Sequence, residues 1–130
     1  MGGRFFGRAV ETGAHRASLE TVRSGAADLA AIDCVSLALF QQQDPQVLAG
    51  LRICGYTAQA PGLPLITSLQ TPAPLLAALQ TALHAAMETE ALAEARTALL
   101  ITGFETVEWP AYDAILAMEQ ASLRQGYAKL

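Results

Sequence analysis

Short extended segments alternate with helical segments along the first part of the chain, and this alternation limits the fold more than any other feature. Bulky and β-branched residues over 5–11, an uninterrupted apolar run at Leu29–Ile32 and an alternating stretch over 51–56 each predict a strand. Helical patterns over 14–23 and 35–40 separate these segments. Strands that alternate with helices predict right-handed crossovers and a parallel sheet, so we expect an α/β fold.

The second part of the chain predicts helices almost throughout. Pro72 and Pro74 open a long helix, in a first turn that tolerates proline. Further helices are predicted over 90–101 and 112–123. We therefore expect a short, mostly parallel sheet with flanking helices and a helical C-terminal tail, which would be natural if the tail packs on another structure.

Composition excludes several classes of protein. Hydrophobic residues make up 52% of the chain and charged residues 15%, which excludes a disordered chain. The net charge of −4 excludes a nucleic-acid binder that works by bulk positive charge. No apolar run reaches the roughly 20 residues of a membrane-spanning helix, and the N-terminal residues lack the apolar core of an export signal.

The two cysteines and the remaining motifs give no sign of a metal or a cofactor. Cys34 and Cys54 have no histidine or cysteine neighbours at metal-ligand spacing, so we expect small buried apolar residues rather than ligands or a disulfide. No nucleophile elbow, phosphate-binding loop or zinc motif is present. We therefore expect no catalytic residue, no metal and no cofactor.

The segment Thr12–Ser18 joins a predicted strand to a predicted helix through a Thr-Gly turn. The first turn of a helix carries free backbone N–H groups and the positive end of the helix dipole, where phosphate-like anions bind. Thr12 would offer a hydroxyl, Gly13 would let the backbone approach a ligand, and His15 would donate a ring N–H. In the alternative, structural interpretation, Thr12 caps the helix, Gly13 forms the turn and His15 is a half-exposed surface residue.

Asp33 ends the apolar run and has two compatible interpretations. Ligands of open α/β sheets bind at the carboxyl ends of the strands, where an acid could bind a cation, an amine or a protonated anion. Aspartate is also a favoured N-cap, and Asp33 directly precedes the next predicted helix.

These segments together resemble one protein family. Residues 12–33, TGAHRASLETVRSGAADLAAID, followed by APGLPLITS, look like the PhnD-like phosphate-, phosphite- and phosphonate-binding proteins of ABC importers, which have the type 2 periplasmic binding fold. In that family a Thr/Ser-Gly-x-His turn, here Thr12 to His15, helps to hold the anion. A Gly-x-x-Asp-x-Ala-Ala-x-Asp segment is here Gly25 to Asp33, and a Thr-x-x-x-Pro-Gly-x-Pro stretch is here Thr57 to Pro64.

The resemblance implies a non-enzymatic oxyanion site and a partial fold. Family members are longer and have two α/β lobes around a cleft, and neither the first lobe nor the Ser-rich anion loop of the second has a counterpart here. Residues 1–58 would then be part of the second lobe, and residues 59–130 the crossover and the helices that return to the first lobe. The implied ligand-binding residues are Thr12, Gly13, Ala14, His15, Ser18 and Asp33, although Ala14 offers no hydroxyl.

The implied function is that of a solute-binding component of an ABC importer for phosphate, phosphite or phosphonate. Its partners would be a small oxyanion, a transporter permease and, through exposed apolar surface, a second copy of the chain; its family is usually periplasmic or membrane-anchored. In the alternative, the chain is a truncated fragment that binds no ligand and acts only through association. An enzyme that uses His15 and Asp33 as an acid–base pair is a third reading, which a large separation of the two residues would exclude.

Overall fold

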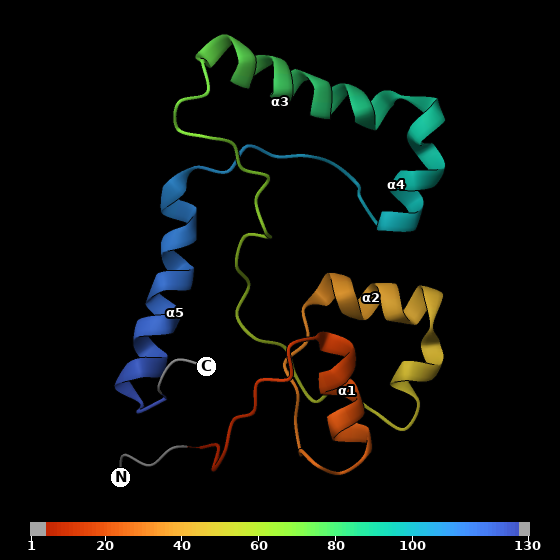
Figure 1. Cartoon of the computed structure of the whole chain (residues 1–130), viewed down its shortest axis with the longest axis vertical. Helices are drawn as coiled ribbons and strands as arrows, with labels where there is room; N and C mark the ends of the chain where they lie inside the picture. Colours follow the sequence, from red (N-terminus) through yellow and green to blue (C-terminus); the bar gives the residue numbers. More distant parts are fainter. Residues whose placement is uncertain (1–4, 128–130) are drawn as a thin grey trace. The chain divides into compact units, whose positions relative to one another are not determined.

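The computed structural model describes residues 5–127, and within this range it consists of helices joined by segments without regular secondary structure (Figure 1). The chain divides into unit 1, formed by Met1–Ala60 and Tyr112–Leu130, and unit 2, formed by Pro61–Ala111. Residues 1–4 and 128–130, which begin and end the two predicted parts of the chain, lie outside the described residues.

Unit 1 contains the helices that position the candidate site. They are α1 (His15–Arg23), α2 (Cys34–Gln43), the 3₁₀ helix η1 (Pro45–Leu48) and α5 (Asp113–Arg124), which follows the 3₁₀ helix η3 (Trp109–Tyr112). The predicted glycine stop of α1 is confirmed, because Gly25 has a φ of 76°, a value that glycine adopts without strain. Both α1 and α2 contact η1.

Unit 2 contains α3 (Ala73–Glu88), the 3₁₀ helix η2 (Glu90–Leu92) and α4 (Ala93–Leu99). Arg96 of α4 donates hydrogen bonds to the carbonyl oxygens of Ala86 and Thr89, at 2.8 and 2.7 Å, and so satisfies acceptors at the C-terminal end of α3. The helix predicted over 90–101 ends early, because Leu100 adopts a left-handed conformation with a φ of 57°. Within residues 5–127 no helix combines the length and the hydropathy that crossing a membrane requires.

The predicted α/β fold is wrong for the part of the chain that the structure describes. The segments over 5–11, 29–32 and 51–56 form no strand, and no backbone hydrogen bond between described residues joins any two of them. A parallel sheet is stable only when helices bury both of its faces. The helices of unit 1 provide no such cover, so the sheet of a type 2 periplasmic binding fold is not formed. Instead, the Phe6 N–H donates to the Tyr127 hydroxyl at 2.8 Å.

The predicted burial of the apolar segments is also wrong. Leu19 of α1, at 6% exposure, is the one buried hydrophobic residue among those described. Leu29, expected at the centre of a sheet, is half exposed, and both Cys34 and Cys54 are exposed free thiols. The predicted buried helix α2 has no buried residue. The described residues therefore leave most of their apolar side chains without cover.

Candidate functional site

The Thr-Gly turn that precedes α1 has the backbone conformation that the sequence predicts. Gly13 has a φ of 78°, so glycine is the residue that fits there without strain. Ala14 occupies the N-cap position with extended backbone, and its side chain provides no cap. The first intrahelical bond runs from the Ser18 N–H to the Ala14 carbonyl, at 3.0 Å. His15 is therefore the first residue of the helix, in the turn whose N–H groups are free.

Thr12 does not cap α1, in contrast to the structural interpretation of the turn. Its hydroxyl donates to the Ala14 carbonyl at 3.2 Å and lies 2.6 Å from the Ser18 hydroxyl, where either oxygen could be the donor. Thr12 and Ser18 are both partly buried. The two hydroxyls thus lie together beside the first turn of α1, on residues that the sequence assigned to one site.

His15 and Asp33 are brought into direct contact. The His15 Nε2 lies 2.7 Å from Asp33 Oδ2, and the two side chains are 44% and 48% exposed. A hydrogen bond at one ring nitrogen of a histidine fixes the orientation of the ring and the role of the other nitrogen. The contact therefore holds the His15 imidazole at the start of α1 while leaving it open to solvent.

Asp33 is the N-cap of α2, as one of its two interpretations predicted. Its Oδ1 accepts a hydrogen bond from the Ser36 N–H at 2.8 Å. Hydrogen bonds from the Ser36 side chain and backbone lower the pKa of Asp33 below its ordinary value of 3.8, with a smaller contribution from the charge of His15. The carboxylate is thus stabilised in its ionised form by the helix that it begins.

This lowered pKa predicts acid sensitivity. The unfolded chain takes up a proton at Asp33 at a higher pH than the folded chain does, so the contribution of Asp33 to stability is complete above its ordinary pKa. The contribution is lost as pH falls from about 5 through the lowered folded pKa. We expect the free energy of unfolding to fall less steeply in Asp33→Asn, because asparagine also caps helices but does not titrate. Urea denaturation between about pH 6 and about pH 3 measures this difference, and equal slopes for both proteins would contradict it.

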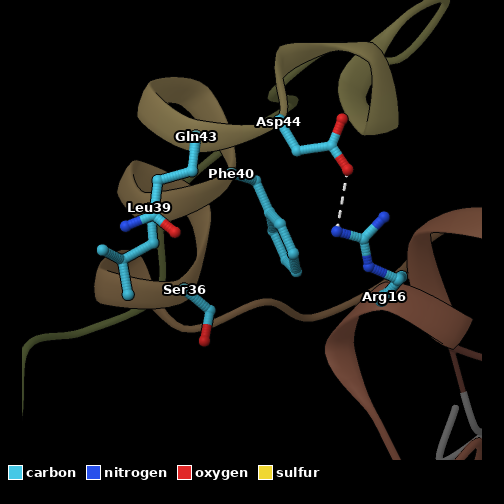
Figure 2. A pocket seen from close by; sticks show the side chains of 6 residues that line it. All are labelled: Arg16, Ser36, Leu39, Phe40, Gln43 and Asp44. Carbon is cyan, nitrogen blue, oxygen red and sulfur yellow. Dashed lines mark hydrogen bonds and ion pairs between the residues drawn. The ribbon is translucent and has the colours of Figure 1, made fainter.

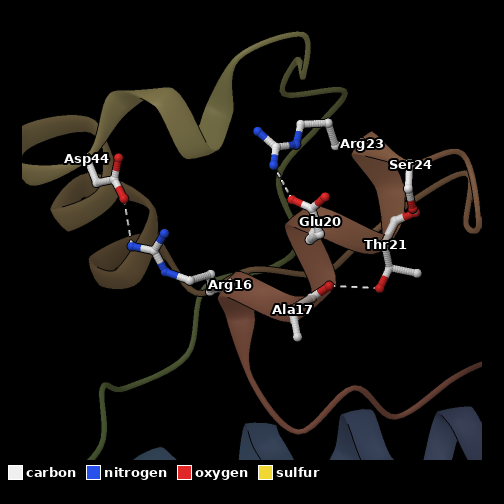
Figure 3. A network of polar contacts seen from close by, with 7 residues as sticks. All are labelled: Arg16, Ala17, Glu20, Thr21, Arg23, Ser24 and Asp44. Atoms are coloured by element: carbon white, nitrogen blue, oxygen red, sulfur yellow. Dashed lines mark hydrogen bonds and ion pairs between the residues drawn. The ribbon is translucent and has the colours of Figure 1, made fainter.

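Arg16, the next residue of α1, contacts the opposite end of α2. Its Nη2 lies 2.8 Å from Oδ2 of Asp44, the C-cap residue of α2, and its guanidinium lies 5.3 Å from the centroid of the Phe40 ring (Figures 2 and 3). Two consecutive residues of α1 therefore bind the two ends of α2: His15 binds the first and Arg16 the last. This pairing fixes the start of α1 against α2.

A pocket lies beside these contacts. It has a volume of about 400 Å³ and is lined by Arg16, Ser36, Leu39, Phe40, Gln43 and Asp44 (Figure 2). Ser36 belongs both to this pocket and to the cap at Asp33. The start of α1 and the start of α2 thus adjoin a hollow with charged and aromatic walls.

Sequence reasoning missed the second ion pair and the role of Ser36. Ser36 lies three residues after Asp33, the spacing between an N-cap and the N–H that it accepts, so a sequence signal for this bond existed. The pairing of Arg16 with Asp44 spans 28 residues and had no local signal. The predicted separation that would exclude an acid–base pair is not observed, since His15 and Asp33 touch.

The arrangement suits an anion better than a metal ion. Its donors are backbone N–H groups of a helix N-terminus, hydroxyls and an imidazole, all of which hydrogen-bond to oxyanions. Residues 5–127 contain no group of three or more histidine, cysteine, aspartate or glutamate side chains that could hold a metal ion.

Comparison with known proteins gives one match. The family model described as "ABC transporter, phosphonate, periplasmic substrate-binding protein" matches residues 2–112. No curated protein and no solved structure matches the chain.

Proposed function

Since the chain belongs to the family of periplasmic substrate-binding proteins of phosphonate ABC transporters, we propose that it binds a tetrahedral phosphorus oxyanion at the start of α1. The ligand class is phosphate, phosphite or a phosphonate. The family consists of transport proteins and not of enzymes, so the contact of His15 with Asp33 serves binding.

One observation supports this site above all others. The His15 imidazole stands at the first position of α1, is held at 2.7 Å by Asp33 and remains 44% exposed. A protonated imidazole donates from both ring nitrogens. Nε2–H would then bond to Asp33, and Nδ1–H would be available for an oxygen of the ligand.

The remaining donors would come from the same turn. The N–H groups of the first turn of α1 accompany the positive end of the helix dipole. The hydroxyls of Thr12 and Ser18 are near each other and could each turn to donate to a ligand oxygen. Gly13 and Ala14 carry no bulky side chain, so the ligand can approach the backbone.

Asp33 would set the charge preference of the site. Its ionised carboxylate offsets the charge of a protonated His15, so the pair adds no net positive charge. A carboxylate near the ligand accepts a hydrogen bond from a protonated oxyanion and repels an unprotonated one. We therefore propose that the site prefers an oxyanion that carries a proton at neutral pH over sulfate, which carries none.

A ligand screen by thermal shift tests the proposed function. The probes are phosphate, phosphite, methylphosphonate, 2-aminoethylphosphonate and sulfate, each at millimolar concentration, because stabilisation grows with the ratio of ligand concentration to Kd. Selective stabilisation by a phosphorus oxyanion supports the proposal. A folded sample that no phosphorus oxyanion stabilises, or that sulfate stabilises equally, would contradict it.

A second candidate function is association, and the exposed apolar side chains favour it. Large hydrophobic residues in both units are exposed, among them Leu63, Leu69 and Trp109. Exposed apolar surface of this extent marks protein–protein contacts. Its occupants would be a transporter permease or a second copy of the chain. We also propose the division at residues 58 and 59 into a ligand-binding part and a part that packs on another lobe.

A further inference from the structure

Helix α3 of unit 2 has an apolar face and a polar face that are cleanly separated. Leu75, Leu79, Ala82 and Ala86 follow one another at spacings of four, three and four residues, which places them on one face of a helix. The polar side chains of α3, those of Gln80, Thr81, His84 and Glu88, lie on the opposite face by the same geometry.

The apolar face of α3 is exposed to solvent. Leu75 is 51% exposed and Leu79 is 44% exposed, and no described residue of unit 2 is buried. Leu76 and Leu83 border the stripe on one side. An exposed leucine face of this kind is stabilised when another surface covers it.

The order of large and small residues along α3 matches itself when a second helix runs in the opposite direction. In an antiparallel pair centred between Gln80 and Thr81, Leu75 lies opposite Ala86 of the second copy, and Leu79 lies opposite Ala82. The bordering residues obey the same rule, because Leu76 falls opposite Ala85 and Leu83 opposite Ala78. Each leucine therefore meets an alanine, which lets two helices approach closely and interdigitate.

Charge does not oppose this pairing. Glu88 is the only charged residue of α3, and it lies at the C-terminal end, far from the centre of the antiparallel pair. At the same end, the apolar surface continues into a pocket of about 520 Å³, which is lined by Met87 and residues of α4 and the segment after it. The N-terminal turn of the second α3, which carries Pro74, would lie beside this pocket in the same register.

We infer that two copies of this chain associate through the Leu75–Leu79–Ala82–Ala86 face of α3, in an antiparallel pair about a two-fold axis between Gln80 and Thr81. A face whose large and small residues complement each other about one point is the property that a two-fold contact requires. The inference rests on the association proposed above and not on oxyanion binding. Contact through one helix per chain is small, so the dimer is expected to dissociate on dilution.

Sedimentation equilibrium of the full chain over a wide range of concentration tests the inference. We expect a reversible monomer–dimer equilibrium. Leu79→Glu places two carboxylates close to the two-fold axis and should raise the dissociation constant by about tenfold or more. His84→Glu adds the same charge to the opposite face of the same helix and should leave the dissociation constant unchanged.

A double variant separates loss of contact from loss of folding. In the proposed register the residue at position 79 faces position 82 of the second copy, so Leu79→Glu combined with Ala82→Lys should restore dimerisation. A chain that stays monomeric at every concentration would overturn both self-association and this inference. A dimer that Leu79→Glu leaves intact, or that the double variant fails to restore, would overturn the α3 contact alone, and neither result bears on oxyanion binding.

Discussion

His15→Ala is expected to weaken oxyanion binding by about tenfold to a hundredfold. The substitution removes a hydrogen bond to a charged ligand, and such a bond contributes about 1.5–3 kcal/mol. The effect on folding should be small, because both His15 and its partner Asp33 are close to half exposed. Isothermal titration with the phosphorus oxyanion that gives the largest thermal shift measures the change in Kd.

His84→Ala is the matched control for this substitution. His84 is the other histidine of the chain, and it lies exposed on α3 in unit 2. Its removal should leave the affinity for the oxyanion unchanged. If His15→Ala and His84→Ala bind the ligand as tightly as the unsubstituted chain, the proposed role of His15 is wrong.

Leu19→Ala is expected to produce the largest loss of stability in unit 1. Leu19 is the one buried hydrophobic residue among those described, at 6% exposure. Truncating a buried leucine to alanine lowers the free energy of unfolding by about 2–5 kcal/mol, and the lower end applies where the surroundings can collapse into the space. Urea denaturation followed by circular dichroism, at one fixed protein concentration, measures the loss.

Leu29→Ala provides the comparison, because it removes the same atoms from a residue that is 50% exposed. We expect this substitution to change the free energy of unfolding by less than about 1 kcal/mol. Equal effects of the two substitutions would mean that Leu19 is no more a part of a core than Leu29 is.

The helices were predictable from the sequence because their signals are local. The positive φ of Gly13 and Gly25 brackets α1, and Pro72 and Pro74 mark the start of α3, as their places in the sequence indicate. Asp33 at the start of α2 fills the N-cap role that its type and position predict. Each of these features depends on residues within one or two turns of the chain.

The strands could not be predicted reliably because their stability is not local. The run Leu29–Ile32 has the composition of a buried parallel strand, but a strand forms only where a neighbour pairs with its backbone and helices cover its faces. The described residues supply neither for this run. The same limit explains the exposure of Cys34 and Cys54, whose predicted burial assumed that sheet.

Part of the candidate site followed from sequence and part did not. The motif that begins at Thr12 places Gly13 and His15 at the start of a helix by spacing alone. The contact of His15 with Asp33 joins residues on two helices, and only the structure brings these two side chains to 2.7 Å. The pairing of Arg16 with Asp44 likewise depends on how α1 meets α2.

Titration of the isotopically labelled chain with phosphate and methylphosphonate, followed by amide NMR shifts, tests the central claim most directly. If the start of α1 binds the oxyanion, the largest shifts will fall on the backbone N–H groups from Gly13 to Ser18 and will spare those around His84. Shifts centred on α3 or α4, or the absence of any shift in a folded sample at millimolar phosphate and methylphosphonate, would contradict the assignment of the oxyanion site to the first turn of α1.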